Sequence, residues 1–181
     1  MASTGAFFDT FEEQLLKYIG HRGQSTSSGA TFPGMVSNPA FVGNYIRLCK
    51  SSPLAVVYPN AFAAVGGLNA TFEPTAAEYA SYAPIVKNSF TTQWDVLETV
   101  LGNGVWQLSN KTQIQFAVPG GASTGCTLTH AILCFQDIDA TFQYGILAAE
   151  LASSIVIPNG GGGSGPLIDV GELTFREVVF A

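Results

Sequence analysis

The sequence is poor in charge, and this scarcity excludes several classes of protein. Only 11% of its 181 residues are Asp, Glu, Lys or Arg, whereas 47% are hydrophobic. Intrinsic disorder requires low hydrophobicity and high charge, so the composition excludes a disordered chain. The seven basic residues form no cluster, and the formal net charge is −6. Because nucleic-acid binding relies on clustered Lys and Arg, we expect no nucleic-acid partner.

Cysteine is also scarce, and its spacing excludes a disulfide framework. The three cysteines, Cys49, Cys126 and Cys134, are odd in number and have no CxxC spacing. We therefore expect buried free thiols in a reducing, cytoplasmic environment. No run reaches the roughly 18 apolar residues of a transmembrane helix. The N-terminus lacks a basic stretch followed by an apolar one, so the sequence predicts neither a membrane span nor a signal peptide.

The two histidines give no metal-binding pattern. His21 and His130 are far apart in the sequence, and neither belongs to an HExxH motif. The Gly-rich run at 158–166 is not followed by GK[ST], so it does not match a phosphate loop and reads as a flexible linker. We expect no metal ion and no other cofactor.

With so few charges, the surface must consist largely of Ser, Thr, Asn, Gln and Gly. Such a surface carries little charge repulsion to keep copies apart, which favours a homo-oligomer. The length suits one domain of ordinary size. We expect a single domain over residues 1–181, with a long Ser-, Gly- and Pro-rich loop at 21–39.

Hydrophobic spacing predicts helices in the first half of the chain. In residues 6–19 apolar side chains recur every four positions, as in an amphipathic helix. Residues 38–53 place an N-cap candidate and a Pro before a further apolar stripe, which predicts a second helix. Residues 71–90 carry Thr75 and Glu78 at the spacing of a capping box, which predicts a third helix.

The apolar period changes to two in the second half, which predicts strands. Residues 92–101 fit a helix or a strand, and their β-branched content with the Gly-Asn-Gly that follows favours a strand. Both faces of the strand predicted at 127–135 are apolar, as in a central strand covered on both sides. The predicted strands span residues 111–121, 127–135, 140–148 and 171–181. Helices followed by antiparallel strands indicate an α+β domain, with N-terminal helices packed on a strongly curved, mostly antiparallel sheet.

This order of elements resembles the nuclear transport factor 2-like superfamily, in particular its SnoaL-like polyketide cyclase branch. Residues 78–82, EYASY, are similar to the family's E-Y-x-x-Y/F helix that leads into the sheet. His130, Phe135 and Asp137 are similar to its strand of the form H-x-x-x-x-F-x-D/E. The resemblance covers about residues 6–157. It implies a cone-like barrel around an apolar cavity, used for cofactor-free cyclisation, isomerisation or dehydration of small hydrophobic molecules.

His130 is the candidate general acid or base. Its ordinary pKa of about 6.5 allows both proton states near neutral pH. Strand parity places it with Leu128, Ile132 and Cys134, and places Asp137 on the opposite face. The alternative is a core histidine that hydrogen-bonds a backbone carbonyl.

Further candidates surround this histidine in the predicted site. Asp95 would orient His130, although strand parity sets Asp95 and Glu98 on opposite faces and both also fit a solvated surface. Tyr79 or Tyr82 would polarise a substrate oxygen. The residues predicted to line the pocket, for which plain core is the alternative, are Tyr82, Trp94, Trp106, Phe116 and Tyr144.

Two functions stay open on this basis. The first is a cofactor-independent lyase or isomerase that acts on a small hydrophobic molecule by proton transfer in an apolar cavity. The second is a non-catalytic self-assembling or coat-type subunit, favoured by the low charge, and a hydrophobic-ligand carrier is a further alternative. An enzyme or a carrier needs empty apolar space inside the sheet, whereas a subunit does not.

Overall fold

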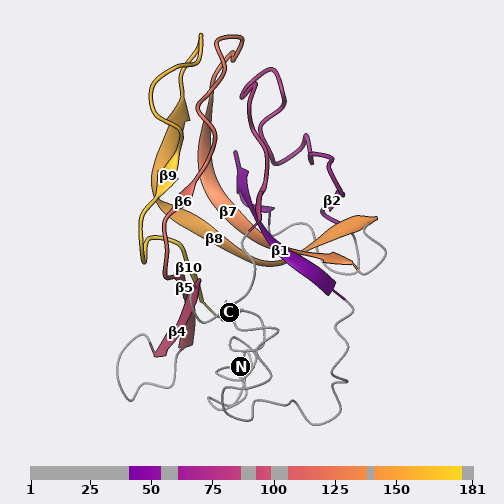
Figure 1. Ribbon diagram of the computed structural model, residues 1–181, viewed down its shortest axis with the longest axis vertical. Helices are drawn as coiled ribbons and strands as arrows, with labels where there is room; N and C mark the ends of the chain where they lie inside the picture. The colour runs from indigo at the N-terminus through magenta and orange to yellow at the C-terminus, as the bar shows by residue number, and fades with distance from the viewer. Residues whose placement is uncertain (1–40, 54–60, 87–92, 99–105, 138–140, 177–181) are drawn as a thin grey trace, which may run out of the picture.

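A computed structural model describes residues 41–53, 61–86, 93–98, 106–137 and 141–176 (Figure 1). Within these ranges the chain forms antiparallel sheets and contains no α-helix. The strands are β1 (Phe41–Cys49), β2 (Ala63–Ala64), β3 (Ile85–Val86), β4 (Trp94–Glu98), β5 (Trp106–Asn110), β6 (Ile114–Gln115), β7 (Cys126–Asp137), β8 (Phe142–Ile157), β9 (Leu167–Ile168) and β10 (Thr174–Arg176).

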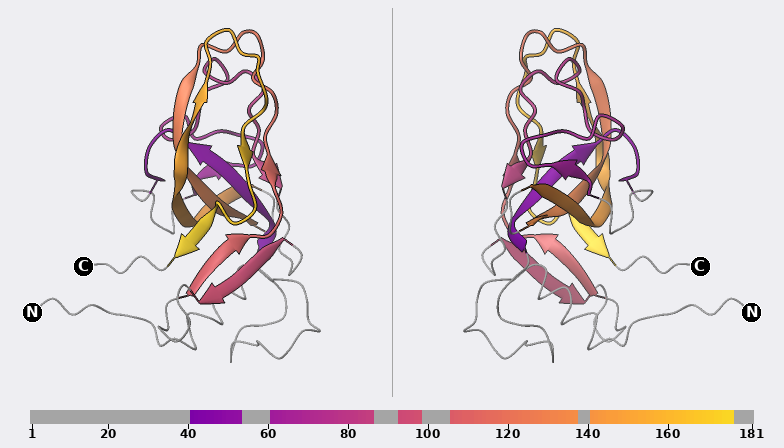
Figure 2. Two further views of the ribbon diagram at one scale, coloured as in Figure 1. Left: turned by 90° about the vertical axis from the view of Figure 1, so that its left-hand side faces the viewer. Right: turned by 90° about the vertical axis from the view of Figure 1, so that its right-hand side faces the viewer.

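The strands are arranged in three sheets. The large sheet has the order β2-β8-β7-β1-β3, and the two smaller sheets have the orders β10-β5-β4 and β6-β9. Figure 2 shows the loops that precede β7 and follow β8 together at one end of the molecule, with β4, β5 and β10 toward the other end. Two backbone bonds hold these loops together, from Gly160 N to Ser123 O (2.8 Å) and from Gly162 N to Pro119 O (2.9 Å).

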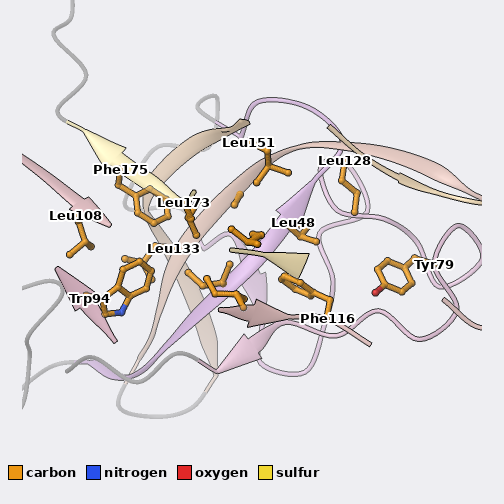
Figure 3. Close-up of a cluster of buried hydrophobic side chains, with 14 of the residues drawn as sticks. Leu48, Tyr79, Trp94, Leu108, Phe116, Leu128, Leu133, Leu151, Leu173 and Phe175 are labelled. Carbon is orange, nitrogen blue, oxygen red and sulfur yellow. The ribbon is translucent and has the colours of Figure 1, made fainter. Parts of the chain in front are cut away.

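The main core joins all three sheets (Figure 3). Every strand except the two-residue β2 and β3 contributes a buried side chain to it, so the smaller sheets pack on one face of the large one. The side chains labelled in Figure 3 are Leu48, Tyr79, Trp94, Leu108, Phe116, Leu128, Leu133, Leu151, Leu173 and Phe175.

A bulge in β8 controls which side chains of β7 reach this core. Between the pairs formed by Leu128 and His130, residues 151–154 of β8 lie opposite Thr129 alone. Such bulges bend a strand and increase its twist. Leu128 and Leu133 are an odd number of positions apart, yet both belong to the main core, because the irregularity changes the parity of β7.

The other face of the large sheet is covered by residues 61–73, which we call the strap. Its first residues run along β8, with bonds from Phe62 N to Gln143 O (2.8 Å) and from Val65 N to Thr141 O (3.0 Å). Its end reaches β1, where Lys50 N donates to the carbonyl of Phe72 (2.7 Å). A second apolar cluster lies beneath it, formed by Cys49, Phe62, Ala63, Ile132 and Cys134.

The predicted α+β class with N-terminal helices is wrong for the described residues. The second predicted helix, at 38–53, contains strand β1. This strand is buried on both faces, because Ile46 and Leu48 join the main core while Cys49 joins the second cluster. Apolar residues therefore do not alternate along it, and the pattern mimics a helical stripe. The helix predicted at 6–19 and the loop predicted at 21–39 lie outside the described residues.

The third predicted helix, at 71–90, is also wrong. The capping box forms as predicted, with bonds from Thr75 N to a Glu78 carboxylate oxygen (2.7 Å) and from Glu78 N to Thr75 Oγ1 (3.2 Å). Only turns follow it before β3. Pro84 lacks an amide hydrogen and disfavours helical geometry in the residue before it, so the turn cannot extend into a helix.

The predicted cone-like barrel is also wrong, because the large sheet is open and ends at β2 and β3.

Three of the predicted strands are confirmed. Residues 92–101 contain β4, and the central strand predicted at 127–135 lies within β7, covered on both faces. The predicted closing strand contains β10, with Phe175 fully buried. Residues 158–166, predicted as a linker, are anchored through Gly160 and Gly162 as described above. Within the described part of the chain, no helix has the length and hydrophobicity needed to cross a membrane.

The packing beneath the strap predicts that Gly145→Ala destabilises the protein. A Cβ at this position would overlap the side chain of Ile132 and reach the Cβ of Phe62. We expect the free energy of unfolding in urea to fall by about 1–3 kcal/mol, as for other overpacked cores. Gly121→Ala is the control, because its Cβ would meet only the carbonyl of Gly160 at 3.8 Å. Equal effects of the two substitutions would contradict the prediction.

Candidate functional site

Two of the aromatic side chains predicted to line a pocket, Trp94 and Phe116, and the predicted catalytic Tyr79 are part of the packed core. Tyr79 and Trp94 are fully buried and Phe116 is 2% exposed, and all three belong to the main core. Trp94 contacts the ring of Phe175 at 6.1 Å between centroids. Figure 3 shows Trp94 and Tyr79 at opposite ends of this core, so they do not frame one pocket.

The structure does bring some of the predicted residues together. The rings of Tyr79 and Tyr82 lie 5.4 Å apart, and those of Tyr82 and Phe116 lie 6.2 Å apart. Tyr79 donates its hydroxyl hydrogen to the carbonyl of Ala117. Tyr144 is half-buried on β8. Trp106 begins β5, and its side chain lies outside what the structure describes.

The predicted acid–base residues lie in different sheets. His130 is on β7, half-buried, with Nδ1 at 2.8 Å from the hydroxyl of Thr129. Leu128 belongs to the main core. Because the irregularity opposite Thr129 separates the two residues, His130 does not lie on the same face as Leu128. Asp95 is on β4 and forms an ion pair with Lys111 at 3.0 Å, with both side chains well exposed. Among the described residues, no hydrogen bond or ion pair links His130, Asp95 and Tyr79 to one another.

A buried polar network that the sequence analysis missed lies between the large sheet and the strap. Its centre is Arg47 of β1, whose side chain is fully buried. The guanidinium donates through Nε to the amide oxygen of Gln143 (2.8 Å), and through Nη1 to the carbonyl of Gly67 (3.1 Å) and the carboxylate of Glu73 (2.8 Å). It also lies over the ring of Phe62, 5.9 Å from the centroid. Its Nη2 is buried and has no hydrogen-bond partner.

The carboxylate of Glu73 is the anionic half of the network and is also fully buried. Besides Arg47, it accepts hydrogen bonds from the backbone amide of Asn69 (2.7 Å) and from the hydroxyl of Tyr82 (2.8 Å). Burial raises the pKa of Glu73 above its ordinary value, while the charge of Arg47 and the three donors oppose that rise. Unpaired, this carboxylate would be costly to bury, so the network holds strap and sheet together.

Tyr82 connects the network to the open edge of the large sheet. β3 pairs only with Tyr45 and Ile46 of β1, so it does not reach Leu48. The hydroxyl of Tyr82 accepts the backbone amide hydrogen of Leu48 at 2.8 Å and donates its own hydrogen to Glu73. Burial raises the pKa of Tyr82 well above its ordinary value, which keeps the phenol protonated as a donor.

A weak signal for this network is present in the sequence. Arg47 interrupts the apolar run YIRLC, and an arginine within a strand covered on both faces must be paired to be buried. The partner, Glu73, lies 26 positions later in a segment predicted as helical, so no local pattern connects the two residues.

The chemistry available to the network is limited by its burial. Arg47 and Glu73 have no exposed side-chain surface, so a reactant would meet them only after the strap had moved. The cysteines beneath the strap are likewise unreactive as thiolates. They are free, as predicted, and burial raises the pKa of Cys49 to about 12 and also raises that of Cys134. Within the described ranges, no group of three or more His, Cys, Asp or Glu residues forms a metal site.

The chain was compared with known proteins. No protein-family model matches it, and no curated protein matches it either. The resemblance to the nuclear transport factor 2-like superfamily therefore stays a prediction. The α+β cone that it implied is not the fold of the described residues.

The network predicts that Tyr82→Phe costs more than Tyr79→Phe. The first removes a donor to a buried carboxylate and the acceptor of the Leu48 amide, whereas the second removes one bond to a backbone carbonyl. Bonds to charged groups contribute about 1.5–3 kcal/mol and neutral ones about 1 kcal/mol. Urea unfolding should therefore show a loss of stability for Tyr82→Phe about twice that for Tyr79→Phe. A larger loss at Tyr79 would contradict this assignment.

The buried thiols predict a loss of stability at alkaline pH. An unfolded thiol ionises near pH 8.5, whereas burial raises the pKa of Cys49 to about 12 and that of Cys126 to about 11. Above about pH 8.5 the unfolded state thus binds fewer protons than the folded state, and stability falls as pH rises, by up to about 1.4 kcal/mol per pH unit for each thiol. Cys49→Ala should make this slope less steep, and an unchanged slope would refute the account.

Proposed function

We propose that the chain is a non-catalytic structural subunit that assembles with copies of itself into a coat-type or similar assembly. The observation that carries the proposal is the packed interior of the described residues. Of the aromatic residues expected to surround a cavity, Trp94 and Phe116 belong to the main core and Tyr82 packs against it, with its ring 6.2 Å from that of Phe116. A surface recess beside β8 and β9 has a volume of about 30 Å³, room for only a few water molecules.

The use of charge supports the same proposal. The described lysines are both in ion pairs, Lys50 with Glu78 at 2.8 Å and Lys111 with Asp95 at 3.0 Å. Arg47 is buried in its own pair. Exposed carboxylates remain at Glu150, Asp169 and Glu172, but with only 11% charged residues in the chain there is little charge to keep neighbouring copies apart.

Exposed apolar side chains could form contacts between copies of the chain. Val156 of β8 is 68% exposed, more than any other large hydrophobic residue in the described ranges. The preceding residue of β8, Ile155, lines the recess together with Leu151 and Leu167. Charged residues are depleted and apolar ones enriched at the centre of interfaces between proteins. A single exposed valine is ordinary in a monomer, so the proposal rests on the combination with the low charge.

The alternative, a cofactor-independent lyase or isomerase acting on a small hydrophobic molecule, has no specific support among the described residues. Its candidate groups already have structural partners, since Asp95 pairs with Lys111 and Tyr79 donates to Ala117. The two proposals differ in what they require of the protein in solution. An assembly subunit forms large particles, whereas the enzyme forms a small species with a cavity that binds hydrophobic dyes.

Light scattering as a function of protein concentration tests the proposed function. We expect particles of many copies, and we expect Val156→Glu to shift the population to small species, because it places a charge in an apolar contact. Val156→Thr is the matched control, since it keeps the β-branched shape without a charge. The melting temperature of both variants should stay close to that of the original chain. A monomer or dimer at every concentration, together with saturable binding of a hydrophobic dye, would overturn the proposal.

A further inference from the structure

The strap has its own set of internal contacts, which makes it a candidate for a separate conformational unit. Asn69 accepts backbone amide hydrogens of Phe72 (3.0 Å) and Glu73 (2.7 Å) through its carbonyl, and its side chain donates to the carbonyl of Phe62 (2.8 Å). The rings of Phe62 and Phe72 stack at 6.1 Å. These contacts close residues 62–73 into one compact loop.

Few backbone bonds attach this loop to the sheet. Apart from the short β2–β8 pairing, they are the bonds of Phe62 and Val65 to β8 and of Phe72 to β1. Gly66 has a φ of 74°, a left-handed conformation that glycine adopts readily, and nothing lies within 4 Å of its Cβ position. Segments with few external bonds open locally at lower free energy than the fold as a whole.

The buried polar network supplies the remaining attachments, because Tyr82 donates to Glu73 and Arg47 contacts the strap at three points. Arg47 contacts the strap through the carbonyl of Gly67, the carboxylate of Glu73 and the ring of Phe62. Its fourth contact is to Gln143 on β8. We propose that the strap is a latched lid that opens as a unit while the sheets stay folded, and that the Arg47–Glu73 ion pair is the latch.

Opening would uncover a defined surface. The side chains beneath the strap are apolar and include two thiols, Cys49 on β1 and Cys134 on β7, both buried in the closed state. The third thiol, Cys126, packs against the main core and lies outside this cluster. Cys126 is partly exposed in the folded chain, so it serves as a reference thiol whose alkylation does not require the strap to open.

The latch is sensitive to the loss of one partner. Removing one member of a buried ion pair leaves the other charge without compensation, which is far more costly than removing both members. Arg47 already has one unpartnered buried nitrogen, Nη2, so it has no spare interaction to replace Glu73. Loss of the carboxylate should therefore shift the strap toward the open state, where Arg47 reaches water.

Alkylation by N-ethylmaleimide, followed by mass spectrometry of each cysteine-containing peptide, tests the proposal in the native protein. We expect Glu73→Gln to raise the alkylation rates of Cys49 and Cys134 together, by roughly a hundredfold or more. The rate of Cys126 should stay within about twofold of that in the original chain. In the original chain, alkylation of Cys134 should depend on urea much less steeply than global unfolding does.

Two control variants make the result specific. Glu172→Gln makes the same chemical change at an exposed carboxylate, which accepts only the backbone amide hydrogen of Asp169, and should alter no rate. The double substitution of Arg47→Met with Glu73→Met removes both charges and should return Cys134 to slow alkylation. If Glu73→Gln fails to fold, Tyr82→Phe takes its place, because it removes one donor to the same carboxylate and should accelerate the same two thiols.

The outcomes separate the proposal from its rivals. Selective acceleration of Cys49 and Cys134 supports a latched strap. If alkylation of Cys134 in the original chain depended on urea as steeply as global unfolding does, opening would require global unfolding, and this would overturn the proposal. Unchanged rates at Cys49 and Cys134 would show that the ion pair does not hold the strap, and would overturn it equally. These outcomes do not depend on whether the protein assembles, because each alkylation rate is compared between variants in the same state of assembly.

Discussion

The large sheet is apolar on both of its faces, and the rest of the structure follows from the need to cover both. β1 and β7 lie at its centre, and each sends side chains into the main core and into the second cluster. The smaller sheets cover one face. The other face is covered by the strap, which has only the two-residue β2 as regular structure. A cover with so little regular structure needs a specific attachment, and Arg47 provides it.

An ion pair is an unusual choice for an apolar layer. Two charges lose their hydration when they are buried, and a well-packed apolar pair of similar volume is often as stable. What an arginine adds is geometry, because its donors point in fixed directions. Here they point to Gln143 on β8, to the carbonyl of Gly67 and to Glu73, so one side chain fixes the position of the strap on the sheet. The network therefore contributes specificity of arrangement more than stability.

The sequence predicted the strands of the second half well and the elements of the first half poorly, for one physical reason. Alternation identifies a strand that has one buried face, and runs such as that of β7 are recognisable because both faces are apolar and β-branched residues are present. β1 has the same double burial, but the Asn-Pro before it and the spacing of its apolar residues resembled features of a helix. The capping box at Thr75 shows that a local motif can form without the helix that it usually begins.

The candidate site was harder to predict than the fold, because it depends on contacts between distant residues. The parity argument for His130 failed at Leu128, since the bulge opposite Thr129 is invisible in the sequence. The pairing of Arg47 with Glu73 depends on the path of the strap, which no local pattern encodes. Tyr82 was predicted as a residue of the substrate pocket. Its hydroxyl is already bonded to Glu73 and Leu48, so it is committed to holding the structure together.

Two further groups on which the predicted chemistry would depend, those of Tyr79 and Asp95, are also held by internal partners. The hydroxyl of Tyr79 bonds to Ala117, and the carboxylate of Asp95 pairs with Lys111. A group held by an internal partner has to lose that partner before it can act on a substrate, and the lost bond adds to the barrier. Neutral side chains and exposed valines are then what the described surface offers to another molecule. Such a surface has few groups for binding or transforming a small polar substrate, but it suits contact with a second surface of the same kind, which is the physical basis for favouring assembly over catalysis.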